Sequence, residues 1–464
     1  MRFPPAAFQL RVSRDWTLQF HQKVYGRPMT TVSQFPVLSC PSSVRQVADD
    51  FNDIVGEHYQ AFTAILCGFV FGIGNLSNIF RFFLFSPSVS TLDRLLTDDG
   101  EIWKKLNRRH RRRLLRLLPR ILEDPDRYMW AIDDTIVPHS GRHIWGTYYW
   151  HDHNTGGTTY GHRLMVVGLV DRKHKVLIPV FWETLHREDK TDSARVHEKG
   201  WEVAIKLLQE TLAMGYPKLL VVADSWFAGE EFFAALKESD FKFVIEIKSN
   251  RTVVGHGRRS LKIRVDEFFK THFRHKIFYR GKSKWAASAV LMFKDGKQKM
   301  RVVAVANKKG LVEEAFAFYA TYELAWDAAK LWAASRDRWA IEVQFRELKQ
   351  LFTLGEVAVR SQNAVETSIS VAAIALTMIR LEQLTRVNAK FENQNVRPIP
   401  AGAIVRDLQL QSLACSISKL AKIDSKEFER FARRINPENF GRKPTGSGIN
   451  HKTGSGSRIY GKTG

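Results

Sequence analysis

The stretch Tyr128-Met-Trp-Ala-Ile-Asp-Asp-Thr-Ile-Val137 marks the point where the chain changes from helical to strand-forming sequence. It is apolar and β-prone through its first half, and it follows Asp124-Pro125, which interrupts the preceding pattern. An ionised Asp133 inside such a strand is costly unless the carboxylate is paired or holds a cation. The stretch therefore predicts a core strand that carries a functional or a well-paired acid.

Further strands and helices are expected on either side of this stretch. Helical patterns run from Val44 to Leu122. After the first strand we expect strands at 163–170, 176–181, 218–224 and 241–247, with helices at 198–214 and 229–237. This order predicts a mixed α/β sheet with covering helices. Residues 250–321 add a separate β-rich insertion with short turns.

The chain is strongly basic. It has 464 residues, with 71 Lys and Arg against 48 Asp and Glu, which gives a formal net charge of +23. Such an excess favours a polyanionic partner, because each neutralised phosphate releases condensed counterions. Nucleic acid is the first candidate and an anionic membrane surface the second. The cationic run 107–120 predicts DNA contacts for Arg111, Arg112 and Arg113, with a solvated helix face as the alternative.

The number of cysteines and the hydropathy of the sequence indicate in which cellular compartment the protein is expected. Cys40, Cys67 and Cys415 match neither a disulfide framework nor a zinc motif, so a reducing cytoplasm is expected. No basic segment followed by an apolar run opens the sequence, so no signal peptide is expected. The apolar run Ala61 to Gly74 is too short to span a bilayer, and we expect no membrane partner.

Two more acids form a set with Asp133. Asp224 follows a buried strand, at the carboxyl end where open α/β sheets hold ligands. Glu342 lies within a helix predicted for residues 336–350, where Arg338, Glu342 and Lys349 form a polar stripe beside an apolar one. A packed helix and neighbouring strands could bring the three carboxylates together.

Carboxylates that share a site repel each other unless divalent cations neutralise them. Hard oxygen ligands select Mg²⁺ or Mn²⁺, and two such ions could activate a water or a 3′-hydroxyl and stabilise the leaving oxygen of a phosphodiester. Each acid also has an ordinary interpretation: Asp133 as a strand-end residue bonded to backbone amides, Asp224 as a helix cap and Glu342 as a salt-bridge partner. Their joint occurrence in a basic protein favours the metal site.

Three blocks of the sequence resemble the motifs of DDE transposases of the IS4 type, closest to the IS701 group. They are Ala-Ile-Asp133-Asp-Thr135, Val-Val-Ala-Asp224-Ser-Trp-Phe227 and Arg338-Trp-Ala-Ile-Glu342-Val-Gln-Phe-Arg-Glu-Leu-Lys349. The third block keeps the family's Arg, Glu and Lys at their spacing, whereas Ser335 stands where the family has a tyrosine. The resemblance covers Tyr128 to about Leu351.

The resemblance implies an RNase H-like mixed α/β sheet with a β-rich insertion, to which the helical pattern before residue 123 adds an N-terminal helical domain. It implies that Asp133, Asp224 and Glu342 are catalytic and bind two Mg²⁺ or Mn²⁺ ions. Asp134 is an alternative to Asp133, but it would point to the opposite face of the strand. The domains expected are an N-terminal arm and helical DNA-binding region at 1–122, core segments at 123–249 and 322–390 around the insertion at 250–321, a C-terminal helical region at 391–440 and a disordered tail at 441–464.

Residues expected to contact DNA lie around these acids. The resemblance implies that Arg338 and Lys349 contact DNA near the scissile phosphate, and Arg346 on the same helix is expected to bind DNA as well. Trp226 could stack on a base, with ordinary packing as the alternative. The histidines between residues 139 and 162 are expected to make polar loop contacts, because their spacing matches no standard structural zinc site.

The resulting hypothesis is a bacterial, cytoplasmic, nucleoid-associated DNA transposase. It would cleave double-stranded DNA at the terminal inverted repeats of a mobile element and join the 3′-hydroxyl ends to target DNA, as a homodimer in the synaptic complex. Two alternatives stay open at this point. One is an RNase H-fold nuclease that cuts without joining, and the other is a non-catalytic DNA-binding descendant of such an enzyme.

Overall fold

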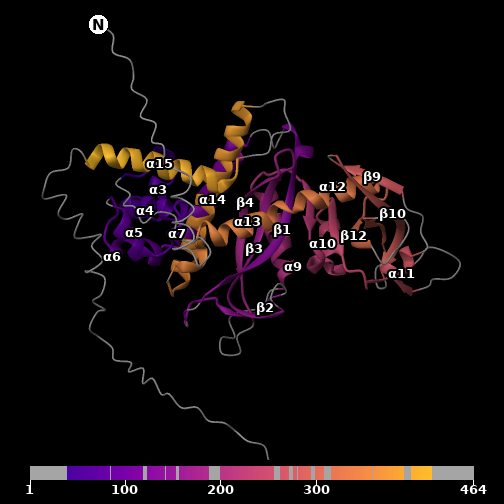
Figure 1. The fold of residues 1–464 in the computed structure, drawn as a ribbon. Coiled ribbons are helices and arrows are strands. Elements are labelled where there is room, and N and C mark those ends of the chain that lie inside the picture. Colours follow the sequence, from indigo (N-terminus) through magenta and orange to yellow (C-terminus); the bar gives the residue numbers. More distant parts are fainter. Residues whose placement is uncertain are drawn as a thin grey trace, which may run out of the picture.

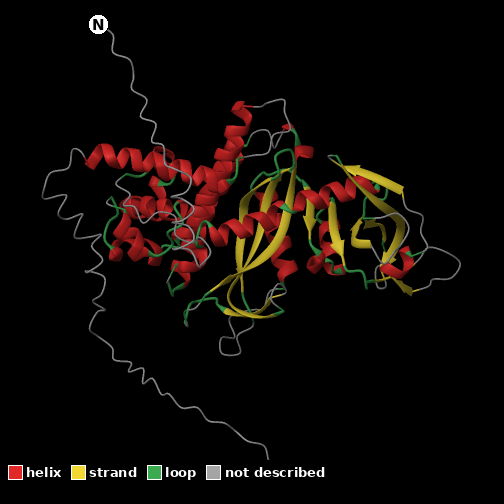
Figure 2. Ribbon diagram, in the orientation of Figure 1, coloured by secondary structure: helices red, strands yellow, loops and turns green. Residues whose placement is uncertain are grey.

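The computed structural model describes most of the chain, whose path is shown in Figures 1 and 2. The described residues are 39–83, 85–118, 123–139, 141, 143–152, 156–187, 199–254, 262–270, 275–279, 281–293, 298–307, 315–357, 359–390 and 399–420. The predicted N-terminal arm before residue 39 and the predicted tail at 441–464 lie outside them.

Helices fill the N-terminal part of the described chain. They are α2 (Ser42–Asp49), α3 (Asn52–Val55), α4 (Tyr59–Val70), α5 (Leu76–Phe82), α6 (Val89–Thr97) and α7 (Ile102–Leu117). The apolar α4 packs against α14 (Gln362–Lys390), and α15 (Ala401–Leu420) also packs on α14. At one end of the molecule, helices from both ends of the chain therefore build one body (Figure 1).

The core sheet explains how distant acids can meet. Its strands are β1 (Tyr128–Pro138), β2 (Tyr148–Asp152), β3 (Gly157–Asp171), β4 (Val176–Leu185), β5 (Leu220–Ala223) and β6 (Phe243–Ile247). In the order β4-β3-β1-β5-β6, β1 pairs parallel with β5 and β5 with β6, whereas β3 pairs antiparallel with both β1 and β4. This arrangement, in which only β3 is reversed, is RNase H-like. The predicted mixed α/β fold is confirmed.

Helices cover both faces of this sheet. On one face lie α9 (Gly200–Ala213) and α10 (Glu230–Glu238), whose apolar side chains join Trp130 and Val221 in one core cluster. On the other face lie α12 (Ala328–Arg338) and α13 (Ala340–Gln350), which pack with Ala131 and Val222. Alternate residues of each strand therefore face different helices.

The strands of the β-rich insertion continue the core sheet. Its elements are β7 (Thr252–Val254), β8 (Lys262–Arg264), α11 (Val265–Phe269), β9 (His275–Tyr279), β10 (Lys282–Phe293), β11 (Lys299–Ala306) and β12 (Ala315–Thr321). Strand β12 pairs antiparallel with β6, so the described strands form one 12-stranded sheet (Figure 2). This pairing satisfies the backbone groups that β6 would otherwise expose at a sheet edge.

One helix in the described part of the chain is long and apolar enough to cross a membrane. It is the stretch Gln362–Arg386 of α14, with a mean hydropathy of 1.5. Of its most apolar window, 94% is buried inside the protein. This helix is thus the centre of the helical body, in contact with α4, α6 and α7.

Candidate active site

Asp133 and Asp224 stand next to each other on neighbouring parallel strands. Ile132 of β1 is in register with Ala223 of β5. The residue that follows each of these is an aspartate, so the two carboxylates occupy matched positions where β5 ends. The strand register thus brings together two acids that are 91 positions apart in the sequence (224 minus 133).

Both acids point to the same face of the sheet. Ala131 and Val222, two residues before each acid, pack with α12 and α13, and the period of two along a strand puts the acids on that face. Asp134 points the other way and binds Arg163 through two hydrogen bonds. The structure thereby supports Asp133 over Asp134 as the partner of Asp224.

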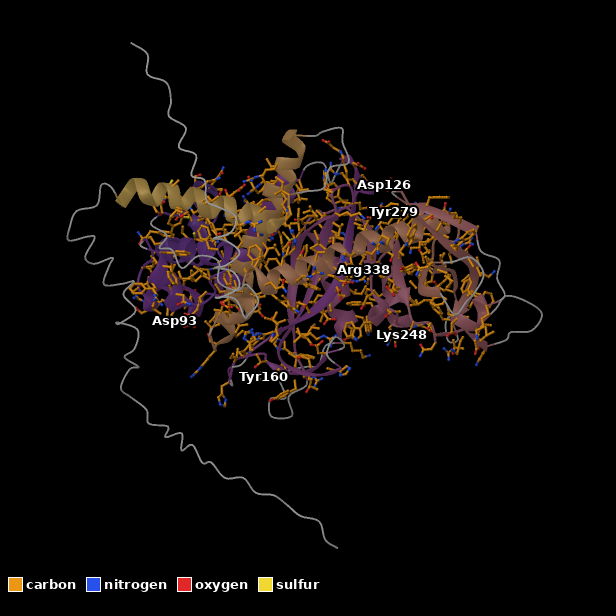
Figure 3. The ribbon with its side chains drawn as sticks, viewed as in Figure 1. Asp93, Asp126, Tyr160, Lys248, Tyr279 and Arg338 are labelled. Carbon is orange, nitrogen blue, oxygen red and sulfur yellow. The ribbon has the colours of Figure 1, made fainter. Side chains whose placement is uncertain are left out.

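Glu342 comes from the helices that cover this face. The predicted single helix is divided into α12 and α13 at Trp339, which places Arg338 at the end of one helix and Glu342 in the first turn of the next. Arg338 Nη2 donates to Glu342 Oε1 at 3.0 Å, and Arg338 Nη1 lies 3.6 Å from Asp133 Oδ2. In Figure 3, Arg338 lies near the middle of the molecule, where the core strands meet the insertion. One guanidinium therefore bridges two of the three predicted metal ligands.

Asp337 anchors this end of α12. Its carboxylate is fully buried, accepts a hydrogen bond from Tyr279 Oη at 2.8 Å, and lies 3.1 Å from Arg172 Nε. Lys175 Nζ is 3.7 Å away. Contacts from β9 and from the end of β3 thus fix the position of the neighbouring Arg338.

The site has more negative than positive charge. Burial raises the pKa of Asp133 well above its usual range, and the charges of Asp224 and Asp134 raise it further, against a lowering by Arg338. Burial also raises the pKa of Asp224. Burial lowers the pKa of Arg338, but the surrounding carboxylates, including Glu342, outweigh that effect and raise it. Bound cations would relieve the repulsion between these acids.

The donor set fits a hard divalent cation. Asp133, Asp224 and Glu342 offer only carboxylate oxygens, the ligands that Mg²⁺ and Mn²⁺ prefer. Arg338 already brings a positive charge between Asp133 and Glu342. Among the described residues, no three His, Cys, Asp or Glu side chains are close enough together to hold one ion. Three ligands would therefore have to converge around an ion from their present positions.

Each acid also makes the ordinary contact that the sequence allowed. The backbone N–H of Asp134 donates to Asp133 Oδ1 at 2.8 Å, and that of Trp226 donates to Asp224 Oδ1 at 2.9 Å. Glu342 is the salt-bridge partner of Arg338. These bonds orient the carboxylates, and the catalytic roles remain predictions.

Asp133 and Asp224 lie in a row of paired residues that runs across neighbouring strands of the sheet. Glu246 and Tyr319 belong to this row, although no sequence motif pointed to them. The register pairs Ala223 with Ile245 and Tyr319 with Glu246, so the row continues from Asp224 across β6 to β12. Burial raises the pKa of Glu246, and burial raises the pKa of the Tyr319 hydroxyl to about 12. Ser335, the residue that replaces the expected tyrosine, interacts with the Tyr319 hydroxyl and opposes this rise in pKa. Strand register, which sequence spacing does not reveal, creates this row.

The other cations of α13 differ in their surroundings. Lys349 faces Asp133, Asp134 and Asp152, whose charges favour the ammonium, although burial lowers its pKa overall. By solvent accessibility, Arg346 and Lys349 are both exposed residues of this helix. Both side chains remain predicted DNA contacts, and Lys349 lies on the side of the acids.

Trp226 borders a cavity of about 410 Å³ beside Asp224. Its ring is 39% exposed, and the guanidinium of Arg163 stacks over it at 4.4 Å. A Cβ on Gly200 would lie only 2.2 Å from the ring, so a larger residue here would displace the Trp226 ring from its present position. The cavity is lined by three tryptophans and three cations, Trp150, Trp201, Trp226, Arg163, Arg187 and Lys199. Such a lining suits an aromatic, anionic ligand.

The three predicted DNA-binding arginines of α7 have different environments. Arg111 pairs with Glu210 at 2.9 Å and stacks over Phe181 at 4.2 Å. Arg113 pairs with Asp50. Arg112 is exposed. Two of the three cations thus already join elements of the fold, and their DNA binding remains a prediction.

The histidines of the loop region bond to each other. His162 Nδ1 lies 2.8 Å from His139 Nε2, and His162 Nε2 lies 2.7 Å from the Trp145 carbonyl oxygen. Burial lowers the pKa of His139 to about 4 and also lowers that of His162. Both rings are therefore neutral at pH 7. His153 lies outside the described residues.

Comparisons with known proteins bear on the site. Residues 87–263 match the model of a family described as DDE superfamily endonuclease, which is less than half of the chain. The match includes Asp133 and Asp224 and ends before Glu342. Among solved structures, the chain is similar to a cryo-EM structure of the piggyBac transposase synaptic complex with hairpin DNA, at 11% identity and a TM-score of 0.42, covering 84% of this chain and 78% of that one. No curated protein matches the chain.

Proposed function

We propose that this protein is a DNA transposase that cuts at the ends of a mobile element and joins the 3′-hydroxyl ends to target DNA. The observation that carries the proposal is the alignment of Asp133 and Asp224 on parallel strands, opposite the helix that bears Glu342. The family match, a DDE superfamily endonuclease, supports a nuclease with this pair of aspartates. The assignment to the IS4 type and the IS701 group rests on the sequence motifs.

In this proposal, Asp133, Asp224 and Glu342 hold two Mg²⁺ or Mn²⁺ ions. When bound, such ions activate a water or a 3′-hydroxyl and stabilise the leaving oxygen. Arg338 and Lys349 bind phosphates of the DNA backbone next to the scissile phosphate, since guanidinium and ammonium groups both bind phosphate. The net charge of +23 supports a polyanionic substrate. The partners are terminal inverted repeats and target DNA, bound by a homodimer in a bacterial cytoplasm.

Cleavage by the full chain tests the proposal. The substrate is a DNA fragment that carries the sequences flanking the gene, incubated with Mg²⁺ or Mn²⁺. The parent protein is expected to cut it, and Glu342→Gln to lose at least roughly 1,000-fold in rate, because one oxygen ligand is lost. Glu238→Gln, at an exposed position at the end of α10, is the matched control. Normal cutting by Glu342→Gln would refute the proposed mechanism.

Joining is measured separately, with pre-cleaved ends that carry a free 3′-hydroxyl. A transposase yields products in which these ends are covalently attached to target DNA. A nuclease without strand transfer cuts the first substrate but yields no joined product from the second. A protein that binds both DNAs and neither cuts nor joins would be a non-catalytic descendant.

A further inference from the structure

We propose that Glu246 is a positioning residue, which in the DNA-free protein receives the guanidinium of Arg338 when divalent cations occupy Asp133, Asp224 and Glu342. The inference rests on the proposed function for the identity of the metal ligands. It assigns a role to a carboxylate outside the three motif blocks. It also makes Arg338 a mobile cation that is exchanged between two sets of carboxylates.

The first step is a competition for oxygen atoms. Arg338 Nη2 donates to Glu342 Oε1 at 3.0 Å, and Nη1 is 3.6 Å from Asp133 Oδ2. Mg²⁺ takes carboxylate oxygens at about 2.0–2.1 Å, and the guanidinium contacts or flanks one oxygen of each of these two carboxylates. An ion bound to Asp133 and Glu342 would also repel the guanidinium. Metal binding therefore favours movement of Arg338 away from both carboxylates.

The second step is the search for another acceptor. The side chain of Arg338 is only 12% exposed, so an acceptor inside the site is closer to its guanidinium than bulk water is. Two other nearby acids are already committed: Asp134 binds Arg163, and Asp337 binds Arg172 and Tyr279. Neither offers a free carboxylate to a second arginine.

Glu246 is the acceptor that remains. Its position next to Asp224 in the register, and the packing of Val244 with α12, direct its side chain to the face on which Arg338 lies. Arg338 already interacts electrostatically with Glu246. Within the described part of the chain, Glu246 makes no side-chain hydrogen bond and no ion pair. A half-buried carboxylate without a partner is a favourable place for a displaced guanidinium.

Manganese binding to the DNA-free full chain tests the inference, by titration calorimetry with Mn²⁺ alone. Arg338→Met removes the competing cation, so Mn²⁺ should bind roughly tenfold more tightly. Glu246→Gln removes the acceptor, so Arg338 stays on the ligands and Mn²⁺ should bind roughly tenfold more weakly. In the double variant, the Glu246→Gln effect should disappear, because the guanidinium whose position it controls is gone.

The double variant separates positioning from direct ligation. If Glu246→Gln still weakens Mn²⁺ binding in the Arg338→Met background, Glu246 is itself a metal ligand and the inference is wrong. If Glu246→Gln has no effect in either background, the inference is also wrong. Glu246→Asp keeps the charge and should restore part of the parent affinity. Thermal unfolding of each variant, with Glu238→Gln as control, shows that the proteins are folded.

Failure of the inference is distinguishable from failure of the proposed function. A parent protein that cuts and joins DNA while the Mn²⁺ cycle shows no coupling keeps its function and loses the role of Glu246. A protein that shows the coupling but neither cuts nor joins DNA keeps the role of Glu246 and loses the transposase assignment. Absence of Mn²⁺ binding in the parent protein would overturn the inference as well.

Discussion

Asp133 and Asp224 occupy matched positions on two parallel strands, because Ile132 is in register with Ala223. The strand pairing places the backbone positions of the two aspartates side by side. Strands hold the backbone positions of a site more precisely than loops do, so convergence around an ion falls mainly to the side chains. The same register brings Glu246 next to Asp224. The predictions below use these positions and the differences between neighbouring residues.

Neighbouring aspartates on β1 should respond differently to the same substitution. Asp133→Asn is expected to abolish metal-dependent cleavage, because its side chain faces Glu342 and Arg338. Asp134→Asn should keep cleavage within about tenfold of the parent rate. It should lower the free energy of unfolding by about 1–3 kcal/mol, because Arg163 loses a charged partner. Cleavage assays and urea unfolding measure both effects, and loss of cleavage only in Asp134→Asn would contradict the assignment.

Arginines of α7 should separate into DNA-binding and structural residues. Arg112→Ala is expected to weaken binding to duplex DNA. The slope of the logarithm of the binding constant against the logarithm of the salt concentration should fall by about one, as expected when one phosphate contact is lost. Arg111→Ala should leave the salt dependence unchanged and lower the free energy of unfolding by about 1–3 kcal/mol, because its partner Glu210 and the packing on Phe181 are lost. Fluorescence anisotropy at several salt concentrations, together with urea unfolding, measures the two effects. The reverse pattern would show that Arg111 faces DNA.

Trp226 should contribute to the binding of unpaired nucleotides. Stacking of a base on an aromatic ring is worth about 1–3 kcal/mol, so Trp226→Ala should weaken binding of a short single-stranded oligonucleotide by roughly 5- to 100-fold. Trp226→Phe keeps a ring and should lose less. Phe278→Ala, an exposed aromatic on β9, is the control. Equal losses for Trp226→Ala and Phe278→Ala in anisotropy measurements would argue against a specific site at Trp226.

Glu366 gives the stability a defined pH dependence. It is buried on α14, and burial raises the pKa of its carboxyl from 4.5 to about 7. A raised folded-state pKa means that the folded protein holds this proton more tightly than the unfolded chain. The stabilisation is complete below pH 4.5 and is lost as the pH rises to about 7. Above this pH the buried carboxylate is ionised, and its charge lowers the free energy of unfolding.

Replacing this carboxyl by an amide removes that pH dependence. Glu366→Gln should raise the free energy of unfolding by roughly 3 kcal/mol at pH 8 and by less than about 1 kcal/mol at pH 5. Urea unfolding of both proteins at the two pH values measures the difference. A gain that is the same at pH 5 and pH 8 would mean that Glu366 does not titrate in this range.

The sequence by itself determined the fold class and the main acids. Strand-forming runs with helices between them predicted a mixed α/β sheet, because alternation and apolar content are local properties. The acids Asp133, Asp224 and Glu342 could be named from their places in strands and in one helix. The confirmed strand order explains why these positions are close. Their catalytic roles remain to be tested.

The tertiary structure decided which residues are partners. Glu246, Tyr319 and Asp337 carried no recognisable motif, and strand register and helix packing, which depend on the whole chain, bring them to the site. The same holds for α7, where Arg111 and Arg112 are neighbours in the sequence. Arg111 points to Glu210 and Arg112 points to solvent, because helical geometry separates adjacent side chains by about 100°. Local sequence specifies the type of element and its charge, whereas packing selects the contact that each charge makes.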